Sequence, residues 1–219
     1  MSFLRKISLI ILLTNVTVVS EAQQGGFGAK AFKRDAPSGR FSVRTTRNEV
    51  DGQQVVEMMD HSSGLTVHSF NTKARSIDAV WSPDSKYIAI EQNISTHHSE
   101  VSLFSITPKV AKRMILPKEC SDQDGAAFDA PTRKRALIAE PLKFHFASEG
   151  LQVVQWSAAD EIVLSTSGLG WWGGDVAKEH DTRFLAEYEI TVHFALDGTS
   201  SLRKLVLKKY EVLQSAVDG

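Results

Sequence analysis

Two short polar segments carry side chains that could bind a metal ion or transfer protons. His97 and His98 are followed closely by Glu100, and His180 directly precedes Asp181. Imidazole and carboxylate groups serve as metal ligands and as general acids and bases. Consecutive residues of an extended chain point to opposite sides, and neither segment has the ligand spacing of a known metal motif. We therefore predict that the protein binds no metal and no cofactor. The alternative is a small metal-dependent or hydrolytic enzyme that uses these residues.

A tryptophan pair within a glycine-rich segment is the second candidate for chemistry. Trp171 and Trp172 lie in the run from Gly168 to Gly174, which we expect to form part of a long excursion between strands. Glycines permit unusual backbone angles, and exposed indoles would form a platform for a sugar, a peptide or an apolar ligand. Alternatively, both indoles fold inward and plug the open end of the sheets. The predicted ligand-binding residues are Trp171, Trp172, His180 and Asp181.

Ser82 and Asp84 are the remaining pair that resembles part of a catalytic arrangement. An aspartate that follows a proline in a turn usually hydrogen-bonds to its own backbone. Neither residue lies in the Gly-x-Ser-x-Gly elbow that presents a nucleophilic serine. We therefore predict no catalytic residues.

The stretch from Val80 to Ile90 contains the clearest structural pattern of the chain. Its sequence is Val-Trp-Ser-Pro-Asp-Ser-Lys-Tyr-Ile-Ala-Ile, which predicts a strand ending on an aromatic residue, a turn and a second strand. Weaker copies occur at 36–43, where the tryptophan is absent, and at 151–164, where Trp156 replaces Trp81 and the proline is absent. Further strand candidates follow each copy, so we expect three units of four strands.

The motif Trp-Ser-Pro-Asp-x-Lys-x-Ile-Ala resembles the repeat of TolB-like and WD40-like β-propellers, in which glycine usually stands at the position of Ser85. This resemblance covers most of residues 33–207 and implies that Trp81 and Trp156 pack between sheets. Three units fall below the four blades of the smallest closed propeller. We expect an all-β fold of three propeller-like, four-stranded antiparallel units that form a partial propeller, a sandwich or part of a propeller shared between copies.

The first residues have the order of a secretory signal peptide. Arg5 and Lys6 precede the apolar run from Ile7 to Leu13, and small residues lead to a cleavage site after Ala22. An uncleaved anchor is the alternative, although the apolar run is short for a membrane span. The expected division of the chain is a signal peptide at 1–22, a flexible leader at 23–32, a β domain at 33–210 with a loop-rich insertion at 117–150, and a tail at 211–219. The expected location is secreted or periplasmic.

Composition narrows the function without identifying it. The chain has 219 residues, of which 42% are hydrophobic, and a formal net charge of −1. Such a charge gives no long-range attraction to nucleic acid. Cys120 is the only cysteine, so no internal disulfide forms. We expect a non-enzymatic binding or scaffold module for a protein, peptide or glycan of the cell envelope, without a stable membrane span after cleavage, and with a second copy of the chain as a further candidate partner.

Overall fold

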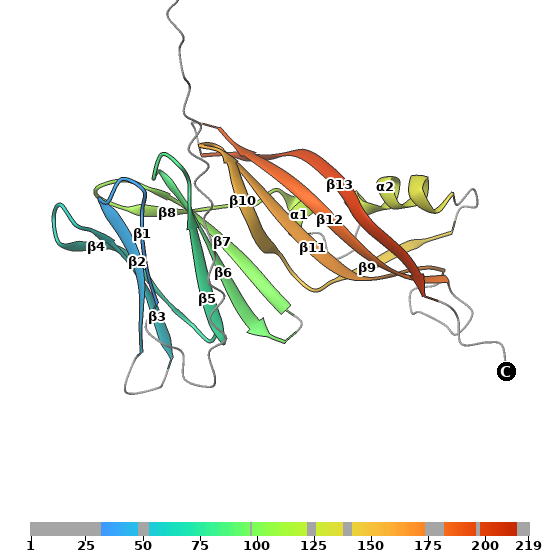
Figure 1. Ribbon diagram of the computed structural model, residues 1–219, viewed down its shortest axis with the longest axis horizontal. Coiled ribbons are helices and arrows are strands. Elements are labelled where there is room, and N and C mark those ends of the chain that lie inside the picture. Colours follow the sequence, from blue (N-terminus) through green and yellow to red (C-terminus); the bar gives the residue numbers. More distant parts are fainter. Residues whose placement is uncertain are drawn as a thin grey trace, which may run out of the picture.

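Three antiparallel sheets form a row in the order of the sequence (Figure 1). The structure is a computed structural model that describes residues 32–47, 53–96, 98–121, 126–137, 142–173, 182–195 and 198–213. His97, His180 and Asp181 lie outside these residues, as do the expected signal peptide and most of the leader. The expected all-β fold of three propeller-like antiparallel units is confirmed.

The first and middle sheets each contain four strands in sequence order. The first sheet consists of β1 (Lys33–Asp35), β2 (Phe41–Arg47), β3 (Gln54–Asp60) and β4 (Leu65–Thr72). The middle sheet consists of β5 (Ser76–Trp81), β6 (Tyr87–Ser95), β7 (His98–Ile106) and β8 (Ala111–Met114). Simple antiparallel hairpins therefore build each of these two units.

The third sheet is larger and includes a strand from the segment that the sequence predicts as an insertion. It consists of β9 (Phe144–Ser148), β10 (Gln152–Ala158), β11 (Glu161–Trp172), β12 (Thr182–Phe194) and β13 (Ser200–Leu213). β9 and β10 pair one after the other with the same side of β11. The helices α1 (Lys118–Ser121) and α2 (Ala126–Ala136) precede β9. The 117–150 segment thus supplies helices and a strand, and β13 continues past residue 210.

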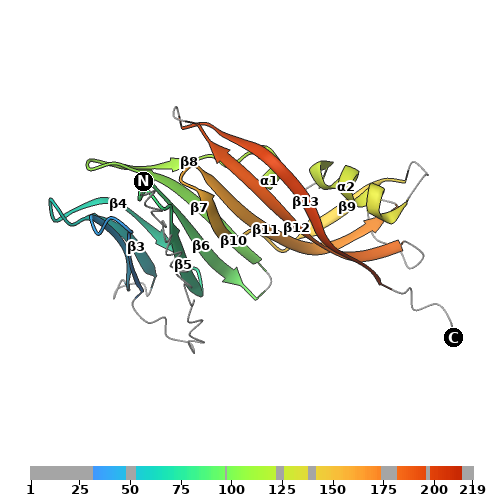
Figure 2. The ribbon, with the colours of Figure 1, turned by 45° about the horizontal axis from the view of Figure 1, so that its top comes forward.

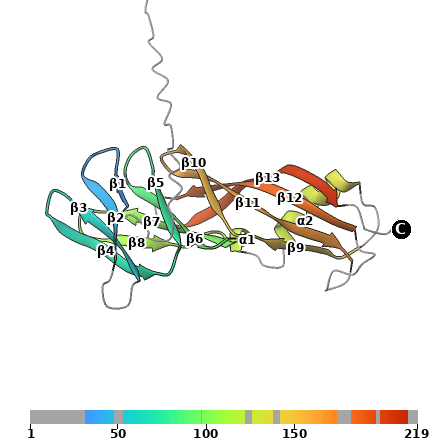
Figure 3. The same ribbon diagram turned by 60° about the horizontal axis from the view of Figure 1, so that its bottom comes forward.

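The middle sheet is covered on both faces. Ile88 and Ile90 of β6 belong to the core against the first sheet, whereas Ala89 between them belongs to the core against the third sheet. All three side chains are fully buried. Because neither face meets water here, the first part of β6, from Tyr87 to Ile90, is a continuous apolar run rather than an alternating one. Figure 3 shows the first and third sheets on either side of the middle sheet.

Each junction between sheets contains the same tryptophan hydrogen bond. Trp81 Nε1 of the middle sheet donates to the backbone oxygen of Arg34 in β1 at 3.2 Å. Trp156 Nε1 of the third sheet donates to the backbone oxygen of Val80 in β5 at 3.0 Å. Arg34 and Val80 occupy equivalent positions, three residues before Pro37 and Pro83. The repeat in the sequence is therefore a repeated junction in space.

Aromatic stacking accompanies both hydrogen bonds. Trp81 stacks on Phe41 with ring centroids 6.5 Å apart, and Trp156 stacks on Tyr87 with centroids 6.0 Å apart. The ring planes meet at 18° and 20°, respectively. Phe41 and Tyr87 are equivalent residues that open the second strand of their units. The packing role implied for Trp81 and Trp156 is present at both junctions.

Replacing Trp81 with phenylalanine tests the contribution of this junction. The variant keeps an aromatic ring near Phe41 but loses the donor to Arg34 and part of the buried volume. We expect the free energy of unfolding to fall by about 1–2 kcal/mol, measured by equilibrium urea denaturation. Trp156→Phe is the matched variant and should show a comparable loss. Unchanged midpoints for both variants would show that these hydrogen bonds do not stabilise the stack.

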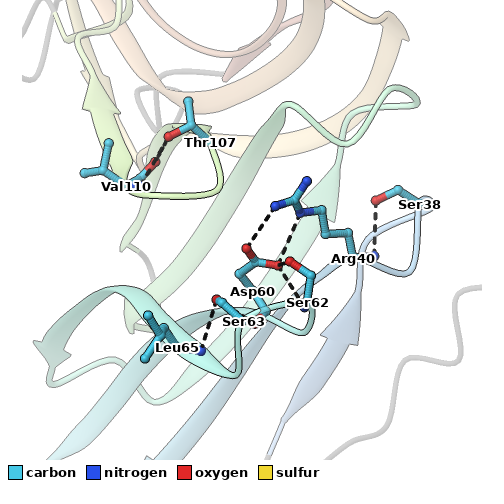
Figure 4. Close-up of polar contacts among 8 residues, drawn as sticks. All are labelled: Ser38, Arg40, Asp60, Ser62, Ser63, Leu65, Thr107 and Val110. Carbon is cyan, nitrogen blue, oxygen red and sulfur yellow. Dashed lines mark hydrogen bonds and ion pairs between the residues drawn. The ribbon is translucent and has the colours of Figure 1, made fainter.

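The turn from Asp60 to Gly64 is held by a buried carboxylate (Figure 4). Arg40 donates to both oxygens of Asp60, at 3.2 and 3.1 Å, and the Ser62 backbone N–H and hydroxyl donate to Oδ1 at 3.0 and 2.7 Å. These hydrogen bonds from Arg40 and Ser62 hold the pKa of Asp60 far below its ordinary value. The carboxylate thus joins the start of β2 to the turn after β3.

Ser85 connects the turns of the first two units. Its φ angle is +62°, in the left-handed region where the repeat usually has glycine. Its hydroxyl accepts a hydrogen bond of 2.9 Å from the backbone N–H of Ser38, in the equivalent turn of the first sheet. Gly39, which is equivalent to Ser85, has a φ of +69°. The serine side chain therefore makes an inter-sheet contact that glycine would lack.

A short parallel bridge joins the middle and third sheets. The Ser99 N–H donates to the oxygen of Glu149 at 3.1 Å, and the Leu151 N–H donates to the oxygen of Ser99 at 3.0 Å. Gly150 lies between these two hydrogen bonds, where the β9–β10 edge bends. Nearby, Glu91 Oε2 accepts from the Val153 N–H at 2.9 Å. Burial raises the pKa of Glu91 despite this hydrogen bond.

Polar residues occupy the junction positions on the outer faces of the two end sheets. In the first sheet, Asp35 pairs with Ser42, whereas the equivalent pair of the middle sheet is Trp81 with Ile88. In the third sheet, Trp156 pairs with Ile162, and the residue before Ile162 is Glu161. In the middle sheet, Trp81 pairs with Ile88, and the residue before Ile88 is Tyr87. Among the residues that the structure describes, the aromatic junction therefore has no counterpart on either outer face, as in the polar caps of stacked repeat proteins.

Candidate functional site

Trp171 and Trp172 lie on opposite faces of the third sheet. The sequence predicts a loop here, but β11 continues through Trp172 and pairs with β9 on one side and β12 on the other. Successive side chains of a strand point to opposite faces. One indole therefore faces the core, and the other faces outward.

The glycines of this segment make room for neighbouring groups. A Cβ atom at Gly170 would lie 2.1 Å from Phe184 Cζ, and one at Gly168 would lie 2.1 Å from the backbone oxygen of Ala147. Both distances are shorter than any van der Waals contact. Gly168 and Gly170 therefore permit close packing within a regular strand rather than the flexible loop that their composition suggests.

Trp172 belongs to an aromatic core on the inner face. Its side chain is 2% exposed, and its ring lies 5.0 Å from Phe144 and 5.9 Å from Phe184. The guanidinium carbon of Arg133 in α2 lies 4.7 Å from the ring centroid, in cation–π geometry. Trp172 Nε1 is buried and has no hydrogen-bond partner among the described residues. Trp172 therefore faces inward from a strand, whereas the inward-folding alternative placed both indoles inside from a loop.

Helix α2 covers this aromatic core through a buried tyrosine. The Tyr188 hydroxyl hydrogen-bonds to the Thr132 hydroxyl, which also lies 2.6 Å from the backbone oxygen of Phe128. Phe128 contacts the Tyr188 ring at a centroid distance of 4.5 Å. Burial raises the pKa of Tyr188 to about 12. α2 therefore covers part of the inner face of the third sheet, whereas the faces of the middle sheet are covered by neighbouring sheets.

Trp171 stacks against a histidine on the outer face. The rings of Trp171 and His145 lie 4.8 Å apart with an angle of 6° between their planes. Both side chains are half-buried, and they are directly opposite each other on β11 and β9. His145 Nε2 is buried with no hydrogen-bond partner among the described residues. One face of the indole is thus covered by imidazole.

Apolar residues continue this surface across three strands. Leu169 of β11 lies opposite Ala147 of β9 and Leu185 of β12, and the Leu185 side chain is 39% exposed. We call the outward side chains of His145, Ala147, Leu169, Trp171 and Leu185 the outer aromatic face. Rigid strands position all of them, and Figure 1 shows β9, β11 and β12 side by side.

The other half of the same sheet surface is polar. Lys208 and Glu189 form an ion pair of 3.2 Å between β13 and β12, and His193 Nε2 lies 3.3 Å from an Asp160 oxygen. The outer aromatic face is therefore confined to the end of the sheet near β9. No sequence pattern indicated His145 or Leu185, because neither lies near a tryptophan in the chain.

The histidine and carboxylate candidates show only one pair within the described residues. His98 Nε2 lies 3.5 Å from Glu100 Oε1 on β7, and both side chains are about half exposed. His97, His180 and Asp181 lie outside the described residues. No three His, Cys, Asp or Glu side chains of the described ranges form a group that could hold a metal ion.

Ser82 and Asp84 are engaged in the turn between β5 and β6. The Ser82 hydroxyl donates to Asp84 Oδ1 at 2.8 Å and accepts from the Tyr87 backbone N–H at 2.9 Å. Asp84 Oδ1 also accepts from the Lys86 N–H at 3.1 Å. Ser82 is fully buried. These contacts match the turn role that the sequence predicts for Asp84.

Comparisons with known proteins return structural neighbours only. No family model and no curated protein matches the chain. Solved structures similar to it include a putative TolB from Agrobacterium tumefaciens (13% identity, TM-score 0.35, 85% of this chain), TolB from Acinetobacter baumannii (9%, 0.30, 78%) and Kuenenia stuttgartiensis hydrazine synthase (14%, 0.33, 63%). The chain spans 52%, 43% and 38% of those chains, respectively. Two of these neighbours are TolB proteins, the family that the repeat resembles.

Proposed function

We propose that this protein is a secreted or periplasmic, non-enzymatic binding module whose contact surface is the outer aromatic face. The observation that supports this most strongly is the outward stack of Trp171 on His145, set in paired strands with apolar neighbours. Tryptophan supplies a large contact area at a low cost in side-chain entropy, and sites on rigid strands lose little freedom on binding. The signal-like order of the first 22 residues supports export. No helix within the described ranges is long and apolar enough to cross a membrane.

The geometry favours a protein or peptide ligand over a glycan. A sugar stacks on the open face of an aromatic ring, but His145 covers one face of Trp171 at 4.8 Å. The stack, together with Leu169 and Leu185, forms an apolar strip between polar neighbours. An aromatic anchor within an apolar centre and a polar rim is the usual composition of a protein interface.

Peptide selection followed by substitution tests this function. Peptides are first selected from a phage-displayed random library against the wild-type protein, and their affinity is then measured by calorimetry. We expect Trp171→Ala to weaken binding about tenfold or more, since aromatic residues dominate binding energy at interfaces. Leu65→Ala, an exposed change on the first sheet, is the matched control and should leave the affinity unchanged.

Two results would contradict the proposal. One is equal affinity of wild-type protein and Trp171→Ala for every selected peptide, which would remove the outer aromatic face from binding. The other is saturable binding of purified peptidoglycan strands together with no peptide enrichment. That result would show that the ligand is a glycan rather than a protein or peptide.

A further inference from the structure

β13 is a long strand with one open edge in the described part of the chain. It extends from Ser200 to Leu213 and pairs with β12 over this range, with irregularities in the register at Arg203 and Lys208. No other described strand pairs with it. In Figure 2 it forms the outermost strand of the third sheet, next to α2. Unpaired N–H and C=O groups of such an edge can accept a further strand.

The charges on β13 are predominantly basic. Four of its five charged residues are Arg203, Lys204, Lys208 and Lys209, and the fifth is Glu211. The side chains of Arg203, Lys208 and Lys209 are between 51% and 62% exposed. Each of these three also contacts a carboxylate of the chain, at 3.1 to 3.8 Å. Lys204 is exposed as well.

The adjacent helix extends this basic region. α2 packs against β13, and its last turn contains Arg133, Lys134 and Arg135. Arg133 is engaged with Asp129 and the Trp172 ring, whereas Lys134 and Arg135 are exposed. An extended ligand along β13 would therefore meet positive charge from the strand and from the helix.

In the registers with the two-fold axis at Val206 or half a residue beyond it, the same charges disfavour pairing of β13 with a second copy of the chain. If two copies of β13 pair antiparallel with the two-fold axis at Val206, Lys204 of one copy faces Lys208 of the other, and Arg203 faces Lys209. A shift of the axis by half a residue places Lys204 opposite Lys209. Like charges directly opposite each other destabilise a strand pair. Acidic side chains at those positions would instead form ion pairs.

We propose that the β13 edge binds an extended, acidic peptide segment of a partner protein as an additional strand. Main-chain hydrogen bonds to the open edge would provide affinity, and carboxylates opposite Lys204 and Lys208 would provide selectivity. This surface is separate from the outer aromatic face, so the inference does not depend on the function proposed above.

The test uses synthetic peptides of defined charge. A fluorescein-labelled peptide of alternating glutamate and threonine is titrated with the full protein at low ionic strength, and its anisotropy is recorded. The charge control alternates lysine with threonine. The backbone control is the glutamate–threonine peptide with every second amide N-methylated, which keeps the charge but removes donors for strand pairing. We expect the acidic peptide to bind and both controls to bind at least about tenfold more weakly.

A pair of variants locates the site. Lys204→Gln with Lys208→Gln removes two charges from β13, whereas Lys109→Gln with Lys112→Gln removes two from the edge hairpin of the middle sheet, where Lys109 and Lys112 are exposed. We expect the first double variant to bind the acidic peptide about tenfold more weakly and the second to bind like the wild type.

Three outcomes would overturn the inference. The first is absence of saturable binding by the acidic peptide. The second is equal affinity for the N-methylated peptide, because the attraction would then be one of charge alone. The third is a dimer in light scattering that persists with excess acidic peptide and dissociates in a Leu205→Pro variant, because β13 would then be occupied by a second copy.

Discussion

Replacing Trp172 with alanine is expected to lower the free energy of unfolding by about 3–5 kcal/mol, the usual cost of truncating a buried large aromatic residue. The indole is 2% exposed and contacts Phe144 and Phe184 on the inner face of the third sheet. Its removal leaves a cavity and also takes the ring from beneath the Arg133 guanidinium. Equilibrium urea denaturation, followed by far-ultraviolet circular dichroism, measures the loss.

Trp171→Ala is the matched control, because it removes the same side chain from the adjacent residue. Trp171 faces outward and is half-buried, so we expect a loss of about 1 kcal/mol or less. Equal losses for the two variants would contradict the assignment of the indoles to opposite faces. A large loss at Trp171 alone would show that the outer aromatic face is part of the core, and would leave Trp172 as the residue to test for binding.

Replacing Gly150 with alanine is expected to lower the free energy of unfolding by about 3 kcal/mol or more. The new Cβ atom would lie 1.9 Å from the backbone oxygen of Ser99, and the φ angle of Gly150 is +103°. The clash involves backbone atoms, so a change of side-chain rotamer cannot relieve it. Two hydrogen bonds between the middle and third sheets, from the N–H groups of Ser99 and Leu151, must lengthen or break.

Hydrogen exchange identifies the site of this damage. The amide protons of Ser99 and Leu151 should lose protection in Gly150→Ala, while the amides inside β2 and β3 keep theirs. Gly64→Ala is the control, because Gly64 has a φ of +71° but open space around its Cβ position. It should lose only about 1 kcal/mol from backbone strain. Comparable losses at Gly64 and Gly150 would show that the close approach to Ser99 contributes nothing.

These two residues stabilise different parts of the molecule. Trp172 supports the internal core of the third sheet, where α2 replaces a neighbouring sheet. Gly150 supports the attachment of the third sheet to the middle sheet through the parallel bridge. Loss of peptide binding in Trp171→Ala with unchanged stability would therefore separate function from both structural roles.

The amino-acid sequence by itself determined the hairpins of the first two units and the tryptophans of the inter-sheet junctions. Strand and turn preferences are local, so the run from Val80 to Ile90 indicated both its hairpin and its weaker copies. The equivalence of Trp81 and Trp156 indicated their shared packing role, because equal positions in a repeat meet equal neighbours. The absence of further cysteines also established that burial, not disulfides, stabilises the fold.

Only the tertiary structure decided which side of the third sheet each candidate residue faces. Trp171 and Trp172 have the same local sequence context, and they differ because this segment pairs as a strand whose successive side chains face opposite ways, with α2 against the face of Trp172. Gly168 and Gly170 suggested a loop. Glycine is needed there because Ala147 and Phe184, which are distant in sequence, occupy the space that a side chain would fill. Such contacts depend on strand pairing and close packing between separate segments, which local residue preferences do not encode.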